Sequence, residues 1–146
     1  MVGPQILNPD KSIQYSCCRF PKVYIPILRR TFLGKLPIFK KKLDHYLMKD
    51  FDHKNKKSID WMIGACLMLK KNILKEINFL DERYFLYFED TDLAKKIHKY
   101  GKKVFYVPEA KVVHFHQRLS ANKLFSKIVL IHILSGIKYF LKWGID

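Results

Sequence analysis

The sequence is organised around a run of aromatic residues that ends in three carboxylates, Tyr84-Phe85-Leu86-Tyr87-Phe88-Glu89-Asp90-Thr91-Asp92-Leu93. Acidic residues are scarce, since the chain has 13 Asp and Glu against 28 Lys and Arg. The aromatic run predicts a buried strand or extended segment. Asp90 or Thr91 predicts a helix start, because such side chains accept hydrogen bonds from free backbone N–H groups. The acids then either supply a general base or metal ligand beside an apolar pocket, or cap a helix and face water.

Length and composition predict one α/β domain with a substantial core, because 146 residues are 49% hydrophobic. The formal charge of +15 predicts an anionic partner, either nucleic acid, an anionic membrane or phosphorylated small molecules. Lys outnumbers Arg, which favours contacts with phosphates or lipid headgroups over sequence-specific recognition of nucleic-acid bases. The cysteines, Cys17, Cys18 and Cys66, form no C-x-x-C pair, and the first residues lack the pattern of a signal peptide, so we expect a cytoplasmic protein.

Short elements are expected before the acidic cluster. A turn at Asn8–Lys11 predicts a small hairpin. Residues 19–57 predict a loop-rich excursion with one or two short helices, which is either a solvated insert or a surface for a phosphate or lipid headgroup. The apolar run Ile59–Leu69 predicts a buried strand with close backbone approach at Gly64, and Lys70–Ile77 predicts a short helix.

Alternating elements are expected after the cluster. Apolar residues at helical spacing predict a helix that ends at Gly101. Lys103–Val107 predicts a strand that Pro108 stops, and Ala110–His116 predicts a second extended segment. The order of these elements is typical of an α/β chain.

The tail, Lys123–Trp143, predicts an amphipathic helix with a wide apolar face. Three placements stay open: in a membrane interface, packed on its own domain or a partner, or across a membrane. Interrupting lysines argue against a span. In the first placement Tyr139, Phe140 and Trp143 would anchor the helix in the interface. The protein would then lie at the inner face of the cell membrane.

Two further pairs of residues could carry chemistry. His114 and His116 lie two apart on a predicted strand, so both could meet one ion completed by carboxylates, which suits Mn²⁺ or Mg²⁺. An H-x-H pair alone is weak support for a metal site. In the pair Asp60-Trp61, either the Asp simply caps a neighbouring turn, or the indole lies beside a cleft and stacks on a sugar or base.

The order and spacing of these motifs is more specific than any one of them. The series is Asp60-Trp61-x-x-Gly64-Ala65, Phe79-x-Asp81-Glu82-x-x-Phe85-x-x-Phe88-Glu89-Asp90-x-Asp92-Leu93, Gly101 and Pro108-x-Ala110-x-x-x-His114. It resembles the C-terminal half of glycosyltransferase family 2, and within it the rhamnosyltransferase-like enzymes of surface polysaccharide synthesis. The resemblance covers residues 2–120 and leaves 121–146 as a separate amphipathic segment.

The resemblance implies the acceptor-side half of a GT-A fold, a nucleotide-diphosphate sugar donor, a glycan or lipid-linked acceptor, a divalent cation (Mn²⁺ or Mg²⁺) and inversion at the anomeric carbon. It implies that Asp90 is the general base and that Glu89 positions the acceptor or shares that role. His114 would help to hold the metal and diphosphate. The residues implied to border the substrate pocket are Asp60, Trp61, Gly64 and Asp92.

The family's N-terminal half, with its nucleotide-binding units and metal-binding Asp-x-Asp, has no counterpart in this sequence. Three explanations stay open: a gene fragment, a mis-called start, or one half of a split enzyme whose other half is a separate chain. Two rival functions also stay open. One is a non-catalytic, basic remnant that binds a membrane or partner, and the other is a nucleic-acid binder, which no recognised motif supports.

Overall fold

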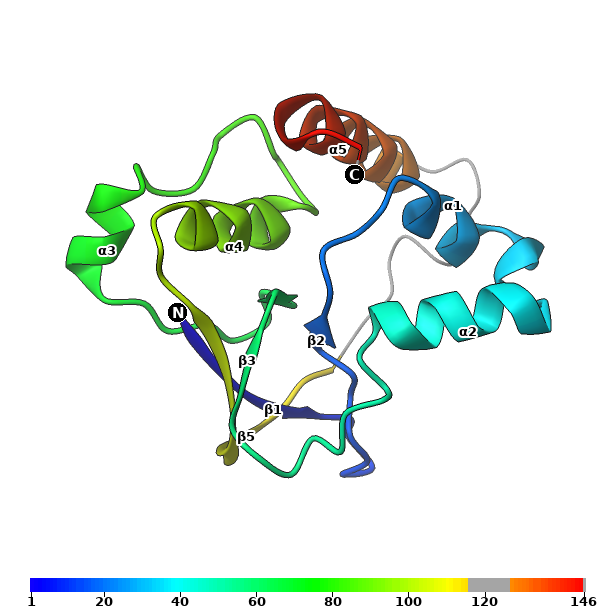
Figure 1. Ribbon diagram of the computed structural model, residues 1–146, viewed down its shortest axis with the longest axis horizontal. Coiled ribbons are helices and arrows are strands. Elements are labelled where there is room, and N and C mark those ends of the chain that lie inside the picture. The colour runs from blue at the N-terminus through cyan, green and yellow to red at the C-terminus, as the bar shows by residue number, and fades with distance from the viewer. Residues whose placement is uncertain (116–126, 146) are drawn as a thin grey trace.

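The computed structural model of the chain describes residues 1–115 and 127–145, so His116 and the predicted helix start at Lys123 lie outside it. The described part is a mixed α/β structure, as predicted (Figure 1). Its strands are β1 (Val2–Leu7), β2 (Cys17–Cys18), β3 (Lys57–Ile59), β4 (Trp61–Met62) and β5 (Val104–Val113). Its helices are α1 (Tyr24–Arg30), α2 (Pro37–Tyr46), α3 (Lys71–Glu76), α4 (Glu89–Lys99) and α5 (Lys127–Trp143), with a 3-10 helix η1 (Phe32–Lys35).

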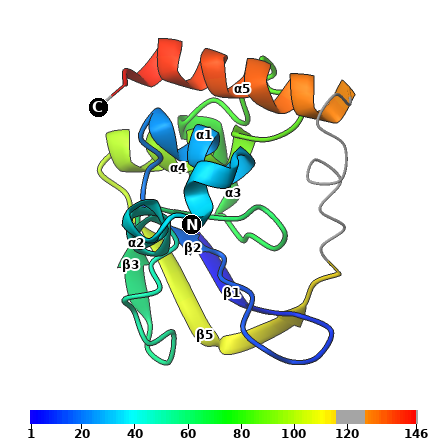
Figure 2. The ribbon, with the colours of Figure 1, turned by 90° about the vertical axis from the view of Figure 1, so that its right-hand side faces the viewer.

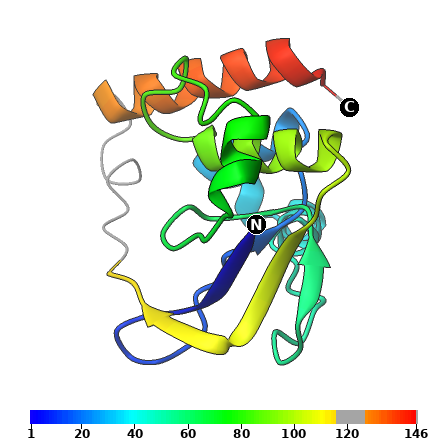
Figure 3. The ribbon, with the colours of Figure 1, turned by 90° about the vertical axis from the view of Figure 1, so that its left-hand side faces the viewer.

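The elements form layers, with α5 at one end of the molecule, α4 and α1 beneath it, and the strands at the opposite end (Figures 2 and 3). The main sheet has the order β1-β5-β3, and β2 pairs with β4 in a second, two-stranded sheet. Helix α4 buries its apolar face, which includes Ala94 and Ile97, in the same core cluster as Val104 of β5. Burial of a side chain as large as Ile97 or Val104 contributes about 2 kcal/mol, so this core fixes α4 relative to the sheet.

Strand β5 is one element, and the prediction of two segments separated at Pro108 is wrong. Its parallel pairing with β1 shifts register, since Pro4 pairs with Val107 whereas Gln5 pairs with Lys111. Proline has no N–H to donate to a ladder, and a bulge leaves it unpaired while the strand continues.

The predicted turn at Asn8–Lys11 is confirmed. Lys11 N–H donates to the Asn8 carbonyl and Asn8 N–H donates to the Ser12 carbonyl, both at 2.9 Å. Lys11 adopts a positive φ of 66°, as the residue that follows a type I turn does in many hairpin loops. The expected short helices within residues 19–57 are also confirmed as α1 and α2, and Pro37 occupies the first turn of α2, where its missing N–H costs nothing.

The continuous strand predicted over Ile59–Leu69 is wrong. Only β3 and β4 are strands, and a turn that contains Gly64 follows them. Side-chain carboxylates pair with the backbone here, because Asp60 Oδ2 accepts from Phe20 N–H and Asp90 Oδ2 accepts from Gly64 N–H, each at 2.9 Å. The short helix predicted next is confirmed as α3.

The aromatic run Tyr84–Phe88 is an irregular loop, and the prediction of an extended segment is wrong. Tyr84 and Phe88 are buried whereas Phe85 is 85% exposed. Tyr87 and Phe88 have φ values of 66° and 67°, and two successive left-handed residues cannot continue a strand. The helix predicted to follow is confirmed as α4.

Helix α5 packs on its own domain, which was one of the three predicted placements. Its Tyr139 is 1% exposed and forms a cluster with Tyr84 and Phe88, against which Phe140 and Trp143 also pack. Tyr139 is therefore not available as a membrane anchor, and this part of the prediction is wrong. Within residues 1–115 and 127–145, no helix is long and apolar enough to cross a membrane.

Candidate active site

Asp90 is the second residue of α4, and backbone groups hold both of its carboxylate oxygens. Oδ2 accepts a hydrogen bond from Gly64 N–H at 2.9 Å, and Oδ1 accepts one from Thr91 N–H at 2.7 Å. Burial raises the pKa of Asp90 above its ordinary value, and these hydrogen bonds offset only part of the increase. The result is an oriented carboxylate that binds a proton more readily than an exposed aspartate.

Glu89, the first residue of α4, has a less restrained carboxylate. Its Oε2 is buried and has no hydrogen-bond partner within the part of the chain that the structure describes. Burial raises the pKa of Glu89, and the charge of the neighbouring Asp90 raises it further. Two adjacent carboxyl groups with raised pKa values are typical of acid–base sites, although structural pairs also show them.

Both carboxylates open into a pocket of about 580 Å³. This volume lies in the range of small-molecule sites. The remaining lining is mainly apolar and comes from the turn after β4, from α3, from the loop that follows α3, and from α4. These residues are Gly64, Leu67, Leu69, Leu74, Phe79, Leu80, Glu82 and Leu93. The pocket therefore combines apolar walls with two proton-accepting groups.

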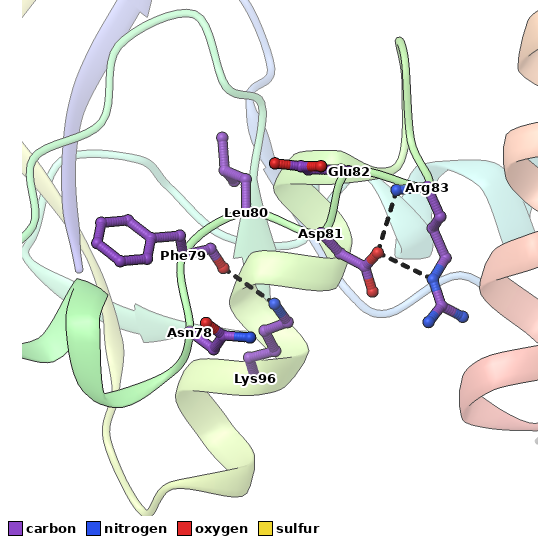
Figure 4. A pocket seen from close by; sticks show the side chains of 7 residues that line it. All are labelled: Asn78, Phe79, Leu80, Asp81, Glu82, Arg83 and Lys96. Atoms are coloured by element: carbon purple, nitrogen blue, oxygen red, sulfur yellow. Dashed lines mark hydrogen bonds and ion pairs between the residues drawn. The ribbon is translucent and has the colours of Figure 1, made fainter.

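A second pocket, of about 450 Å³, is lined by the loop that follows α3 and by Lys96 of α4 (Figure 4). It shares Phe79, Leu80 and Glu82 with the first pocket, and its other lining residues are polar. Lys96 Nζ donates to the Phe79 carbonyl at 2.9 Å and so ties this loop to α4. The loop is a common wall that α4 holds in place.

The predicted pair Asp60 and Trp61 lies outside the lining of both pockets. Asp60 accepts from the backbone of Phe20, as described above. Trp61 is 6% exposed, and its Nε1–H donates to the Arg19 carbonyl at 2.8 Å. Both side chains hold the segment after β2 against β4, and for Asp60 this corresponds to the alternative in which it caps a neighbouring backbone group.

Asp92 also lies outside the pocket, although it is only two residues from Asp90. It is 1% exposed, and its Oδ1 accepts from Lys142 Nζ and Trp143 Nε1–H, each at 2.6 Å. Tyr84 donates to the same oxygen at 3.3 Å. Asp92 therefore anchors α5 to α4.

His114, the predicted metal ligand, follows the end of β5. Its Nδ1 hydrogen-bonds with Gln14 Oε1 at 2.8 Å, and its N–H donates to the Leu7 carbonyl. Among residues 1–115 and 127–145, no three His, Cys, Asp or Glu side chains gather closely enough to hold a metal ion. The described residues thus do not by themselves fit a divalent cation.

The apolar wall of the pocket is the functional feature that sequence reasoning missed. Leu67 and Leu69 are two apart after Gly64, so their shared face could have been identified from alternation. A turn at residues 78–82 is predicted by the sequence, and the positive φ values of Asn78 (57°) and Phe79 (52°) agree with it. The sequence did not show that this turn places Phe79 against the carboxylates, because that depends on long-range packing.

Comparison with known proteins identifies rhamnosyltransferases. The chain is 30% identical over 113 residues to "N-acetylglucosaminyl-diphospho-decaprenol L-rhamnosyltransferase" of Mycobacterium tuberculosis, in strains CDC 1551 / Oshkosh and ATCC 25618 / H37Rv. It is 28% identical over 81 residues to "Rhamnosyltransferase WbbL" of Escherichia coli K12. These matches cover 77% and 56% of this chain but only 36% and 30% of the respective relatives.

No family model matches the chain, and no solved structure gives a significant match. The chain spans about a third of the length of the curated relatives it matches. The matches support a relationship between this chain and the glycosyltransferases.

Proposed function

We propose that the chain is the acceptor-side part of a GT-A glycosyltransferase that transfers a sugar from a nucleotide-diphosphate donor to a cell-envelope glycan or lipid-linked acceptor. The observation that carries this proposal is the pair of carboxylates at the start of α4. Asp90 is held by Gly64 N–H, both pKa values are raised, and an apolar pocket opens beside them.

In this proposal Asp90 is the general base. It takes the proton of the acceptor hydroxyl while the hydroxyl oxygen forms a bond to the anomeric carbon of the donor sugar. The bond between that carbon and the diphosphate oxygen breaks, and the nucleoside diphosphate leaves with the electron pair. Direct displacement inverts the anomeric centre. A raised pKa favours this role, because a carboxylate that ionises closer to neutral pH is the stronger base.

Glu89 orients the acceptor hydroxyl in this scheme. Its buried Oε2 has no partner among the described residues, so it can accept a hydrogen bond from a bound hydroxyl without losing an existing one. Gly64 keeps the approach open, since a side chain there would contact Asp90. The two carboxylates thus divide proton transfer and positioning between them.

The walls of the pocket support an acceptor with an apolar part. Leu67, Leu69, Leu74 and Phe79 surround the carboxylates, and a free glycan would leave these side chains without an apolar partner. The mycobacterial relatives are named for an acceptor that carries a decaprenol chain. We therefore propose a lipid-linked acceptor over a free polysaccharide end.

Donor binding is proposed to need protein that this chain does not contain, because the relatives are about three times as long as the part matched here. That protein could be a separate partner chain. The divalent cation stays a prediction, with His114 as its proposed ligand, and needs donors beyond the described residues.

The test is sugar transfer in vitro. The chain is assayed alone and together with a protein that supplies the remaining two thirds of the relatives' length, using labelled nucleotide-diphosphate sugars, rhamnose included, and a polyprenyl-diphosphate acceptor that carries N-acetylglucosamine. We expect transfer in the combined sample. No transfer from any donor in the panel, with both proteins folded, would contradict the proposal and favour a non-catalytic binding protein.

A further inference from the structure

We propose that helix α5 docks the protein on an anionic lipid bilayer through the face that it turns away from the domain. This outer face consists of five exposed side chains, Leu130 (56%), Ile133 (47%), Leu134 (45%), Ile137 (51%) and Leu141 (82%). At about 100° per residue they fall within an arc of about 100° on one side of the helix. An amphipathic helix on a protein surface normally presents polar residues to the solvent. The apolar outer face of α5 is therefore expected to be covered by a binding partner.

The position of α5 leaves this face accessible within the described structure. The helix runs along the outside of the molecule, and its opposite side supplies the packing with the domain (Figures 2 and 3). On that opposite side Tyr139 is buried, and Ser135 Oγ donates to the Leu86 carbonyl at 2.9 Å. Because the two sides are separate, the outer face is not needed to hold α5 in place.

Charge favours an anionic bilayer over a second copy of the chain. Residues 127–145 contain no acidic residue, and Lys127 and Lys138 lie at one border of the outer face. Two copies meeting through α5 would bring these lysines together, and each chain carries a formal charge of +15. Anionic headgroups would instead pair with the lysines while the apolar side chains enter the acyl boundary.

The neighbouring helix α1 also exposes an apolar side chain close in sequence to a cation. It lies beside α5, and Arg30 of α1 contacts the His132 ring of α5 (Figure 1). It exposes the apolar Ile27 (55%), next to the exposed cation Arg29. Apolar side chains flanked by cations on two adjacent helices are typical of a peripheral membrane surface.

Docking through α5 would also place the proposed active site near lipid, and this step alone rests on the proposed function. Gly136 of α5 lies against Phe88, the residue that precedes Glu89 and Asp90, since a Cβ at Gly136 would be 3.3 Å from the Phe88 ring. The exposed Phe85 belongs to the same loop. The headgroup of a lipid-linked acceptor would then lie within reach of α4.

Vesicle flotation of the full chain tests the docking, using vesicles without any sugar donor or acceptor. We compare phosphatidylcholine alone with phosphatidylcholine that contains roughly one third phosphatidylglycerol. Wild type is expected to float with the anionic vesicles. Ile137→Gln together with Leu141→Gln should lower the partition coefficient by about tenfold or more, because two buried apolar side chains are lost.

The matched control is Met68→Gln together with Phe115→Gln, which removes two equally exposed apolar side chains (72% each) that do not belong to α5 and should float like wild type. Circular dichroism checks that each variant is folded, and Leu130→Gln with Leu134→Gln serves as a second outer-face pair. Unchanged flotation of both outer-face pairs, or a dimer that these substitutions dissociate without any lipid binding, would overturn the proposal. Because the vesicles carry no substrate, this result is independent of sugar transfer.

Discussion

The carboxylate of Asp90 and the backbone N–H of Gly64 are joined by a hydrogen bond of 2.9 Å that connects two segments 26 residues apart in the sequence. It ties the first turn of α4 to the turn after β4, and both segments line the apolar pocket. The orientation of the proposed base therefore depends on a glycine that contributes no side chain.

Gly64→Ala should impair catalysis more than stability. The new Cβ would lie 3.3 Å from Cβ and 3.5 Å from Oδ2 of Asp90, so the carboxylate must move by a few tenths of an ångström. We expect kcat to fall by about tenfold, because small displacements of a reacting group are costly, and the free energy of unfolding to fall by less than about 1 kcal/mol. Steady-state transfer kinetics and urea unfolding measure the two effects.

Gly101→Ala is the control for that substitution. Gly101 has a φ of +68°, and a Cβ added there would meet no other atom of the described residues within 4 Å. Alanine should therefore cost about 1 kcal/mol through backbone strain and leave kcat unchanged. Equal losses of kcat in the two variants would show that Gly64 acts only through general stability.

Glu89→Gln should stabilise the fold at neutral pH. A carboxyl group whose pKa is raised by folding is harder to ionise in the folded state than in the unfolded chain, so its charge costs stability above its folded pKa. The cost decreases as the pH falls below that pKa and is gone below the ordinary value of 4.5, and the gain of the glutamine variant should disappear with it. Urea unfolding as a function of pH checks this, and a variant less stable than wild type at neutral pH would contradict it.

Asp92→Ala should release α5. The substitution leaves the partly buried Lys142 ammonium without one of its two carboxylate partners and removes the acceptor of Trp143 Nε1–H. Loss of one member of a buried ion pair costs about 3 kcal/mol. We expect this loss in urea unfolding, together with faster proteolysis of α5. Lys138→Ala, which removes only an exposed bond to the Arg83 carbonyl, should cost less than about 0.5 kcal/mol.

Protonation of His132 at acidic pH should weaken the packing of α5 on the domain. Burial, together with the positive charges of Arg30 and Arg29, lowers the pKa of His132 from 6.5 to about 4, and its ring stacks on Tyr87 at 4.2 Å. The unfolded chain therefore binds more protons between pH 6.5 and 4, and stability falls as the pH decreases through this window. His132→Gln should remove this dependence. The difference between variant and wild type isolates it from the carboxyl groups.

Local sequence signals were sufficient to predict those elements that depend mainly on interactions between residues close in the sequence. Helix α4 followed from its acidic start and from Gly101, and the pair Glu89 and Asp90 followed from its place among the motifs. Long-range contacts decided the rest. The loop Tyr84–Phe88 is irregular because α5 packs on it, and Pro108 sits in a bulge that only the pairing with β1 reveals.

The same distinction applies within the site. Asp90 and Asp92 share a residue type and lie two apart, and the family resemblance placed both at the substrate pocket. On a helix two positions differ by about 200°, which turns Asp90 toward Gly64 and Asp92 toward Lys142. The apolar wall of the pocket likewise depends on the left-handed backbone at Asn78 and Phe79.

The central claim, that Asp90 is the base of a sugar transferase, is tested most directly by the kinetics of Asp90→Asn in the combined enzyme. Asparagine keeps the size of the side chain and an oxygen for Gly64 N–H but cannot accept the proton. The account predicts a fall in kcat of about 10²-fold or more with donor affinity unchanged, whereas Glu76→Gln, on the exposed side of α3, retains full activity. Transfer by Asp90→Asn at the wild-type rate would contradict the account.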